Sequence, residues 1–348
     1  MTNIYKCPSC GAPIEFDSKE GKMSCNYCGS SFDVSQIDEQ YKKYEDTIVD
    51  ETEIDKEYCE FDGYRCGNCG AEVATDETTT ATFCSFCGSP TLIRNRLGGS
   101  LKPHYVIPFK IEKKEAVEAY KKWTGKGIIT PSCFRKKSTI EKITGLYVPF
   151  WIYDYDVDAY VRAVGTRKSR DRRGDTIYEH TAHYSIGRNV SASYEMVPAD
   201  ASEKMDDKTM DLLEPFDYSE MKPFEMPYLS GYFADKYSYS MEEMKNRVET
   251  RVRNYIFEEA RKTIVGYSTV QMLGSNMNLK RKKAYYTLMP VWVLNYEYKG
   301  KKYSFNMNGQ TGRIVGKPPK SFAKIAALFC GVTAASAGIF ALLGGLFG

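Results

Sequence analysis

Residues 66–87 read CGNCGAEVATDETTTATFCSFC, and they repeat a pattern already present in residues 7–28, CPSCGAPIEFDSKEGKMSCNYC. In both stretches 14 residues separate two Cys-x-x-Cys pairs, and the second stretch lies 59 residues after the first. Zinc takes four thiolates at the corners of a tetrahedron, and a Cys-x-x-Cys turn delivers two of them to one side of the ion. The duplication therefore predicts two zinc ribbons, each holding one Zn²⁺.

The predicted ligands are all the cysteines of these two stretches, and glycine follows each pair at a turn position that favours positive φ. They are Cys7, Cys10, Cys25 and Cys28 in the first ribbon, and Cys66, Cys69, Cys84 and Cys87 in the second. A catalytic zinc keeps one coordination position open, whereas four thiolates leave none. Both ions are therefore expected to be structural.

Disulfide bonds and a thioredoxin-like redox motif are the alternatives to zinc for paired cysteines. Disulfides require an exported chain, and residues 1–10, MTNIYKCPSC, contain no basic region followed by an apolar run, so no signal peptide is expected. Cys59, Cys133 and Cys330 stand alone in the sequence and are interpreted as buried or bystander thiols.

Charge is distributed unevenly along the 348 residues. The formal net charge is +3, but residues 38–62 carry a net charge of −8, so the rest of the chain carries +11. Apolar positions spaced by three and four from Val34 to Ile48 predict an amphipathic helix between the ribbons, with Asp33 and Gln36 as its capping box. We interpret this helix as a spacer; a partner-binding helix is the alternative.

The C-terminal end is apolar over residues 325–347, IAALFCGVTAASAGIFALLGGLF. As a helix, this charge-free run would span about 34 Å. Lys317, Lys320 and Lys324 precede it and no charge follows it, so the positive-inside rule predicts a cytoplasmic N-terminal body. The sequence thus predicts a transmembrane helix over 322–347 and a single-pass location in the cell membrane, with a buried core helix as the alternative.

Residues 101–316 mix strand and helix patterns. Apolar runs that contain proline at 106–109, 147–151 and 288–292 predict strand starts or edges. Alternation on both sides of TRKSRDRRGD, 166–175, predicts a β-hairpin, and the runs that follow Pro290 predict a three-stranded meander. An amphipathic helix is predicted to begin with a capping box formed by Ser240 and Glu243.

These patterns together predict an α+β fold with antiparallel sheet. The predicted order is zinc ribbon 1 (1–33), acidic helical spacer (34–62), zinc ribbon 2 (63–97), α+β domain with antiparallel sheet (101–316) and transmembrane helix (322–347).

Several motifs outside the ribbons resemble a family of bacterial proteins named for a zinc ribbon of the transcription factor IIB type. These motifs are YVIPFK (105–110), GLYVPFWIYD (145–154), SEKMDD (202–207), EPFDYSEM (214–221), YLSGYFADKY (228–237), LMPVWVLN (288–295) and NMNGQTGRIVG (306–316). The resemblance covers nearly the whole chain. It implies tandem zinc ribbons, an α+β domain and a C-terminal membrane segment, without implying an activity.

Catalytic motifs are missing from the sequence, which has no phosphate-binding loop, no nucleophile elbow and no His-Glu-x-x-His helix. His180 and His183 are three residues apart, and on a strand this spacing directs two side chains to opposite faces. The sequence therefore predicts no enzyme, with no catalytic and no cofactor-binding residues beyond the zinc ligands.

Two groups of basic residues could meet an anionic partner. They are Arg162, Arg167, Lys168, Arg170, Arg172 and Arg173 in the first group, and Lys280, Arg281, Lys282 and Lys283 in the second. Solvated loop tips, anionic lipid headgroups and, least favoured, nucleic acid are the three interpretations. We favour a membrane-tethered cytosolic adaptor with structural zinc and a protein partner; the alternative is a membrane-held nucleic-acid-binding regulator that uses the ribbons and basic loops.

Overall fold

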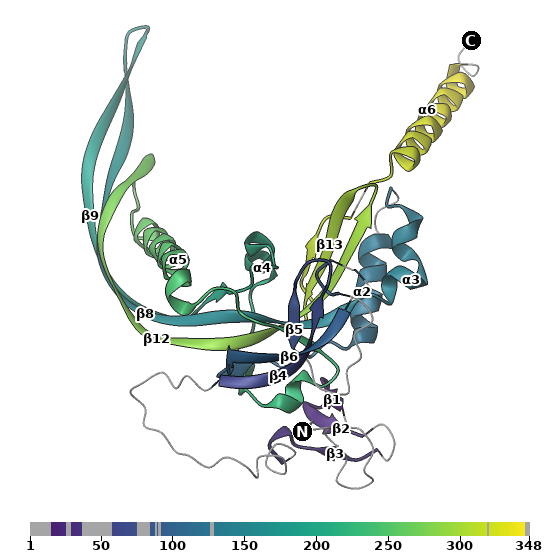
Figure 1. Ribbon diagram of the computed structural model, residues 1–348. Helices are drawn as coiled ribbons and strands as arrows, with labels where there is room; N and C mark the ends of the chain where they lie inside the picture. The colour runs from purple at the N-terminus through teal and green to yellow at the C-terminus, as the bar shows by residue number, and fades with distance from the viewer. Residues whose placement is uncertain are drawn as a thin grey trace. The chain divides into compact units, whose positions relative to one another are not determined.

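The chain is described by a computed structural model over residues 15–25, 29–36, 58–74, 84–87, 89, 92–125, 129–318 and 320–344 (Figure 1). It divides into two compact units, each made of separate segments. Unit 1 comprises residues 1–149, 204–236 and 288–348, and unit 2 comprises residues 150–203 and 237–287. The long strands β8 (Thr144–Arg173) and β12 (Thr269–Tyr298) contribute residues to both units.

The described residues form mostly β-sheet, so the prediction of an α+β fold is wrong. Among the described residues, two sheets are present, a small one of three strands and a large mixed one of 11 strands. The sequence patterns suggested short strands separated by loops, whereas β8 and β12 each run through 30 residues without interruption. The strand content exceeds the expectation because charged residues that were interpreted as a loop, such as 166–173, lie within β8.

The small sheet belongs to the first ribbon and consists of β1 (Glu15–Asp17), β2 (Lys22–Ser24) and β3 (Ser31–Phe32). Its strands are antiparallel. The ring of Phe16 lies 5.1 Å from that of Tyr228, and the Lys19 ammonium lies 3.1 Å from the Glu112 carboxylate. These aromatic and ionic contacts hold the described part of the first ribbon against the rest of unit 1.

The second ribbon is part of the large sheet. Its strands are β4 (Tyr58–Cys66), β5 (Glu72–Ala74) and β6 (Leu92–Leu101), and β4 lies between the other two. Strand β5 pairs with β11 (Phe233–Asp235), and β11 pairs in parallel with β8. The ribbon therefore extends the sheet of unit 1 through backbone hydrogen bonds instead of forming a separate module.

The other strands of unit 1 pair with β12 directly or through a neighbouring strand. They are β7 (Tyr105–Val106), β10 (Lys222–Pro223), β13 (Lys301–Asn308) and β14 (Ile314–Gly316). Strands β12, β13 and β14 form the predicted antiparallel meander, and this prediction is confirmed. Lys299 and Gly300 connect β12 to β13 with φ values of 52° and 71°, the positive values that a tight hairpin turn requires.

Short helices complete unit 1. They are α2 (Lys113–Gly125), α3 (Lys137–Ile140), α4 (Asp207–Leu213) and the 3₁₀ turns Ser132–Arg135, Tyr218–Glu220 and Met226–Leu229. The three proline-containing apolar runs each contribute an aromatic side chain to one cluster in the core. The Phe109 ring stacks on Tyr232 at 4.1 Å and meets the edges of Tyr147 and Trp292 at 5.0 and 5.1 Å.

Two of the family-like motifs meet in a buried polar network. The Asn308 side chain is fully buried, and its amide donates to the carbonyl oxygens of Leu213 and Pro215 at 3.0 and 3.3 Å. The Gln310 amide donates to the carbonyl of Asp217 at 3.0 Å and to the Glu220 carboxylate at 2.9 Å. Because buried polar groups are costly when unsatisfied, these residues specify how the 306–316 turn packs on the 214–221 segment.

Unit 2 is a three-stranded antiparallel sheet with one helix on one face. The sheet has the order β9 (Thr176–Asp200), β8 and β12, and the helix is α5 (Met241–Lys262) (Figure 1). The predicted hairpin is confirmed, but its loop is shorter than predicted, because pairing continues as far as Arg173 and Thr176. Most of TRKSRDRRGD is therefore strand.

Helix α5 begins at its predicted capping box, in which the backbone N–H of Ser240 donates to Glu243 Oε2 at 2.7 Å. Its buried face includes Met244, Val248, Val252 and Ile256, which recur at helical spacing. Buried side chains of the sheet, among them Val157, form the other half of this core. The periodicity seen in the sequence thus gives the face on which α5 packs.

The C-terminal helix α6 (Phe322–Gly344) corrects the prediction for residues 322–347. Within the described part of the chain, no helix combines the length and the apolar character that crossing a membrane requires. The predicted transmembrane helix, and with it the single-pass location in the cell membrane, is therefore not supported. The predicted helix begins at residue 322, as α6 does, but the prediction treated Lys324 as a charge that flanks the membrane, whereas the Lys324 ammonium donates to the carbonyl of Thr130 at 2.8 Å.

Of the predicted acidic helical spacer, 34–62, residues 34–36 are helical, whereas residues 58–62 belong to strand β4 and are not helix. Residues 37–57 lie outside the described part of the chain. The Asp33 N–H donates to Gln36 Oε1 at 3.4 Å, as the predicted capping box requires.

Candidate metal centre

The second ribbon brings four thiols together. Cys66, Cys69, Cys84 and Cys87 place their Sγ atoms within 4.8 Å of one another. Two of the separations are 3.6 Å, between Cys66 and Cys87, and 3.7 Å, between Cys69 and Cys84. A tetrahedron with Zn–S bonds of about 2.3 Å has edges of about 3.8 Å. The cluster is thus of the right size for one zinc ion.

Backbone turns hold the thiols in position. The Cys66 N–H donates to the carbonyl of Ala71 at 2.8 Å, and the Gly70 N–H donates back to the carbonyl of Cys66 at 2.9 Å. Gly70 has a φ of +71°, which explains the glycine at this position. The Cys84 N–H likewise donates to the carbonyl of Ser89 at 2.7 Å. Each Cys-x-x-Cys pair therefore lies on a tight turn that directs both thiols inward.

Burial and hydrogen bonding shift the pKa values of the thiols in opposite directions. Burial raises the pKa of Cys84 and of Cys69, because it penalises the thiolate form. Burial also opposes the Cys87 thiolate, but the Asn68 amide and the Ser89 N–H outweigh it and lower the pKa of Cys87 to about 7. A divalent cation would supply the positive charge that the buried thiolates lack, so the site fits zinc chemically as well as in size.

The cluster is joined to the large sheet on two sides. Cys66 is the last residue of β4, which pairs with β5, and β5 pairs with β11. The Asn295 amide of β12 donates to the carbonyl of Ser85, between the two cysteines of the second turn, at 2.7 Å. A metal ion at this position would therefore stabilise the edge of the sheet as well as the ribbon.

We predict that Asn68→Ala weakens zinc binding by about 10- to 100-fold, the usual effect of losing a hydrogen bond to a ligand. The Asn68 amide lies 3.6 Å from Cys87 Sγ, and its loss raises the pKa of that thiol, so protons compete better with the metal. Competition with a chromophoric chelator at pH 7 measures the affinity. Asn278→Ala, in unit 2, is the matched control, and equal affinities for the two variants would contradict the assignment.

Cys25 alone of the first predicted ligand set is described, since Cys7, Cys10 and Cys28 lie outside the described residues. Its N–H donates to the carbonyl of Ser30 at 2.9 Å, and the Gly29 N–H donates to the carbonyl of Cys25 at 2.8 Å. These are the hydrogen bonds that surround Cys66 in the second ribbon. Among described residues, one complete cluster of four cysteines is present.

The first basic group lies on the β8–β9 hairpin, and four of its six cations form ion pairs with three acidic neighbours. Lys168 and Arg170 both pair with Glu179, at 2.8 and 3.3 Å. These contacts, with the Lys168 hydrogen bond foremost, lower the pKa of the Glu179 carboxyl. Arg173 pairs with Asp171 at 3.3 Å. These ion pairs could not be predicted from the sequence, because the charges come together only when β8 and β9 pair.

The second basic group and the two histidines were the other candidate functional residues in the sequence. In the second basic group, Arg281 pairs with Glu242 at 2.7 Å and Lys282 pairs with Asp156 at 3.3 Å. His180 and His183 are exposed on β9, opposite Ser169 and Thr166 of β8. Neither histidine belongs to a group of three or more possible metal ligands within the described residues.

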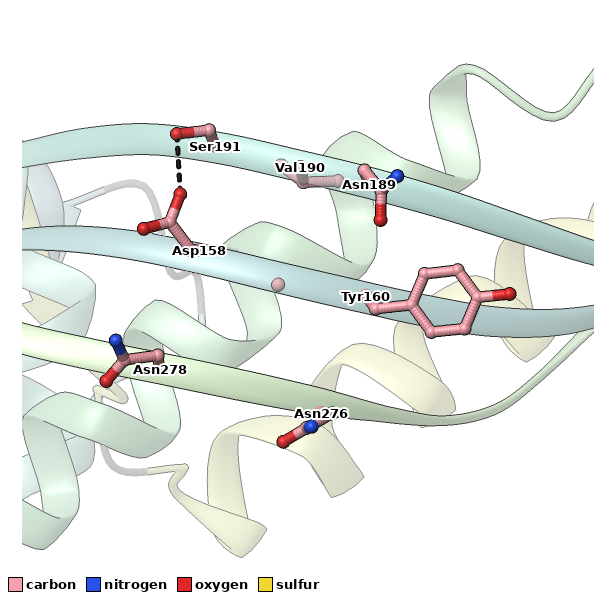
Figure 2. Close-up of a pocket in the computed structure, with 8 residues that line it drawn as sticks. Asp158, Tyr160, Asn189, Val190, Ser191, Asn276 and Asn278 are labelled. Atoms are coloured by element: carbon pink, nitrogen blue, oxygen red, sulfur yellow. Dashed lines mark hydrogen bonds between the residues drawn. The ribbon is translucent and has the colours of Figure 1, made fainter.

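A polar face on unit 2 escaped the sequence analysis. Figure 2 shows side chains from the three strands β8, β9 and β12 that line this face. The pocket that they line has a volume of about 470 Å³. The Ser191 hydroxyl of β9 donates to Asp158 of β8 at 2.8 Å, and Ser193 donates to Asp156 at 2.6 Å in the same way. The alternation of serines and aspartates along the two strands was visible in the sequence, but the register that pairs them was not.

Comparisons with known proteins give one informative relative. No family model matches the chain, and no solved structure matches it. The chain is 39% identical over 334 residues to a Bacillus subtilis (strain 168) protein named uncharacterized protein YdjG, and the match covers 95% of this chain and 94% of that protein. Such identity over nearly the full length of both proteins shows common descent. The chain therefore belongs to the same family as YdjG.

Proposed function

We propose that the chain is a zinc-stabilised adaptor, in which the metal is structural and exposed side chains of unit 2 bind a protein partner. The cysteine cluster carries the structural half of this proposal. Four thiolates at tetrahedral spacing fill the coordination sphere of zinc, so neither water nor substrate has a position on the ion. The metal would then stabilise the edge of the large sheet and take no part in chemistry, which fits our expectation that the protein is not an enzyme.

A second zinc ion in the first ribbon is part of this proposal. The turn around Cys25 has the same two backbone hydrogen bonds as the turn around Cys66, and Gly29 has a φ of +73° where Gly70 has +71°. Together with the repeated spacing of Cys7, Cys10, Cys25 and Cys28, this likeness supports equal metal binding by both ribbons. The resemblance to proteins with a zinc ribbon of the transcription factor IIB type is consistent with it.

The end of the β8–β9 hairpin supports the protein-binding half. Ile177 and Tyr178 are 64% and 48% exposed there, and Tyr184 is 39% exposed. The Arg167 guanidinium lies 5.2 Å from the ring of Tyr184 and 5.1 Å from the ring of Tyr267. Tyrosine and arginine dominate the residues that contribute most to protein–protein binding. By strand alternation, Ile177 lies on one face of the hairpin, and Arg167, Tyr178 and Tyr184 lie on the other. We call these four residues, on the two faces of the hairpin end, the hairpin surface.

Nucleic acid is a weaker partner for the hairpin surface. Binding to nucleic acid depends on free cations that neutralise phosphates. Lys168, Arg170 and Arg173 are instead engaged with carboxylates of the same hairpin. Exposed aliphatic and aromatic side chains between these ion pairs suit a protein better.

Photo-crosslinking in cells tests the proposal. With p-benzoylphenylalanine in place of Tyr178 of the full-length chain, we expect a discrete crosslinked protein that resists nuclease digestion and is lost in an Ile177→Asp variant. Tyr239 is 37% exposed and belongs to the same unit, so the same probe at that position is the control. A nuclease-sensitive product, or equal products from both positions, would overturn the proposal.

A further inference from the structure

A groove of about 890 Å³ lies in unit 1, where α4, β13, β14 and the segment before α6 meet. Basic side chains from four places in the sequence converge on it. They are Lys208 of α4, Lys301 and Lys302 of β13, Arg313 before β14, and Lys317 and Lys320 before α6. We call this site the basic groove.

The lining of the basic groove holds six basic side chains and one acidic side chain, and Glu297 of β12 lies opposite Lys302 in the β12–β13 ladder. Its one acidic side chain, Asp206, caps α4 by accepting a hydrogen bond from the Thr209 N–H at 2.9 Å. No ion pair to any of the five lysines occurs within the described part of the chain. Cations elsewhere, such as Lys168 and Lys282, do have carboxylate partners. The groove therefore concentrates positive charge that is available to an anionic ligand.

Strand β14 offers a row of backbone groups beside these cations. It pairs with β13 and, within the described residues, with no other strand. The Asn308 N–H donates to the carbonyl of Arg313 at 2.9 Å, and the same register continues to Met307 and Ile314. Hydrogen-bonded pairs alternate in an antiparallel ladder, so the amide groups of Ile314 and Gly316 are directed away from β13. An extended chain could pair with them.

Apolar side chains also lie along the groove. Leu212 is 54% exposed and Phe322 is 82% exposed, and both line it. Ile314 and Val315 are half-buried in the same lining. A ligand that matches the groove therefore needs acidic groups, apolar groups and a strand-forming backbone together.

We propose that the basic groove binds an extended acidic segment of a partner protein, which adds a strand to β14. An added strand would place carboxylates against the lysines and apolar side chains against Leu212 and Phe322, which line the same groove. Phosphates of a nucleic acid would pair with the lysines, but a nucleic acid offers no groups that match the apolar side chains and the backbone amides of β14. An acidic peptide therefore fits the groove better. The proposal concerns unit 1 and does not rest on the hairpin surface of unit 2.

Fluorescence anisotropy with the full-length, zinc-loaded protein tests this inference. The probe is a labelled ten-residue peptide of alternating glutamate and valine, and labelled oligothymidine is the comparison. We expect the peptide to bind, and the double variant Lys301→Glu with Lys317→Glu to bind it at least about tenfold more weakly, since both cations oppose its carboxylates. Lys114→Glu with Lys121→Glu on α2 changes the net charge equally outside the groove and should leave the affinity unchanged.

Strand addition is tested with two N-methylated peptides, which block alternate sets of amides. One of them should lose binding and the other should keep it, because one set faces β14. If neither N-methylated peptide loses binding, strand addition is overturned. The proposal would also be overturned if both double variants weakened peptide binding equally, or if the peptide did not bind at low salt. The lysines would then serve only to keep the edge of the sheet from pairing with other chains. Tighter binding of oligothymidine than of peptide, with the same dependence on Lys301 and Lys317, would assign the groove to nucleic acid.

Discussion

Replacement of Cys66 by serine is expected to remove one zinc ion per chain and to lower the melting temperature by more than about 10 °C. Binding of structural zinc by small zinc-finger peptides contributes about 10–16 kcal/mol, as much as the whole stability of many domains. The Cys66 side chain is 1% exposed, so the serine hydroxyl that replaces its thiol cannot turn to solvent. Even a few kcal/mol correspond to a shift of this size, at about 2–4 °C per kcal/mol.

The effect should extend beyond the ribbon. Strand β5 pairs with β11, and β11 pairs with β8. Loss of the metal should therefore weaken a series of backbone hydrogen bonds that extends from the ribbon into the core of unit 1. Hydrogen exchange should therefore accelerate in β4, β5 and β11. Elemental analysis measures the zinc content. Cys330→Ser, at an exposed position in α6, is the matched control and should change neither quantity. Unchanged zinc content in the Cys66 variant would refute the site.

The second large effect is expected in unit 2, where Asp200→Asn should cost about 3–5 kcal/mol of the free energy of unfolding. The Asp200 side chain is fully buried at the end of β9, and its carboxylate lies 2.7 Å from the guanidinium of Arg247 on α5. Removing the carboxylate leaves a positive charge in a partly buried position without its counter-ion. The ion pair also joins the helix to the sheet, so α5 should become more accessible to exchange.

Urea denaturation monitored by tryptophan fluorescence measures this change, since Trp151 lies in unit 2 and donates to the carbonyl of Tyr239 at 2.9 Å. Asp156→Asn is the control, because its partner Lys282 is exposed and the exposed pair should matter much less. Adding Arg247→Met to Asp200→Asn should restore part of the loss, because it removes the unpaired cation. Equal shifts for Asp200→Asn and Asp156→Asn would show that burial of the pair has no energetic role.

Local signals in the sequence predicted local structure well. The Cys-x-x-Cys spacing in residues 66–87 gave the four cysteines that the structure brings together. The Ser240 capping box and the periodicity behind it gave the start and the buried face of α5. In each case the interacting residues are close in the chain, or their spacing matches a repeating backbone geometry, so a pattern of residue types was sufficient.

Long-range pairing was beyond the sequence. Nothing around Ala74 indicates that it will pair with Ala234, and this pairing is what makes the second ribbon part of the large sheet. The stretch 166–175 was interpreted as a loop because of its charges, yet it is mostly strand, since Lys168 and Arg170 find Glu179 across the hairpin. The basic groove was missed for the same reason, because its cations are far apart in the chain.

The prediction for the C-terminal end was wrong in another way. The prediction rested on the absence of charge over 325–347, and the described residues contain no helix suited to crossing a membrane. The Lys324 ammonium, which was taken as a charge flanking the membrane, instead donates to the carbonyl of Thr130. Net charge beside an apolar run therefore did not distinguish a membrane flank from a contact with a folded unit.

Zinc K-edge X-ray absorption on the full-length Cys25→Ser variant tests the central claim most directly, because this variant retains one complete set of cysteines. We predict one zinc ion per chain with four sulfur ligands at about 2.3 Å, which the Sγ separations of 3.6 and 3.7 Å in the second ribbon require. Nitrogen or oxygen ligands in the spectrum, or a variant that binds no zinc, would contradict a closed structural site at Cys66, Cys69, Cys84 and Cys87.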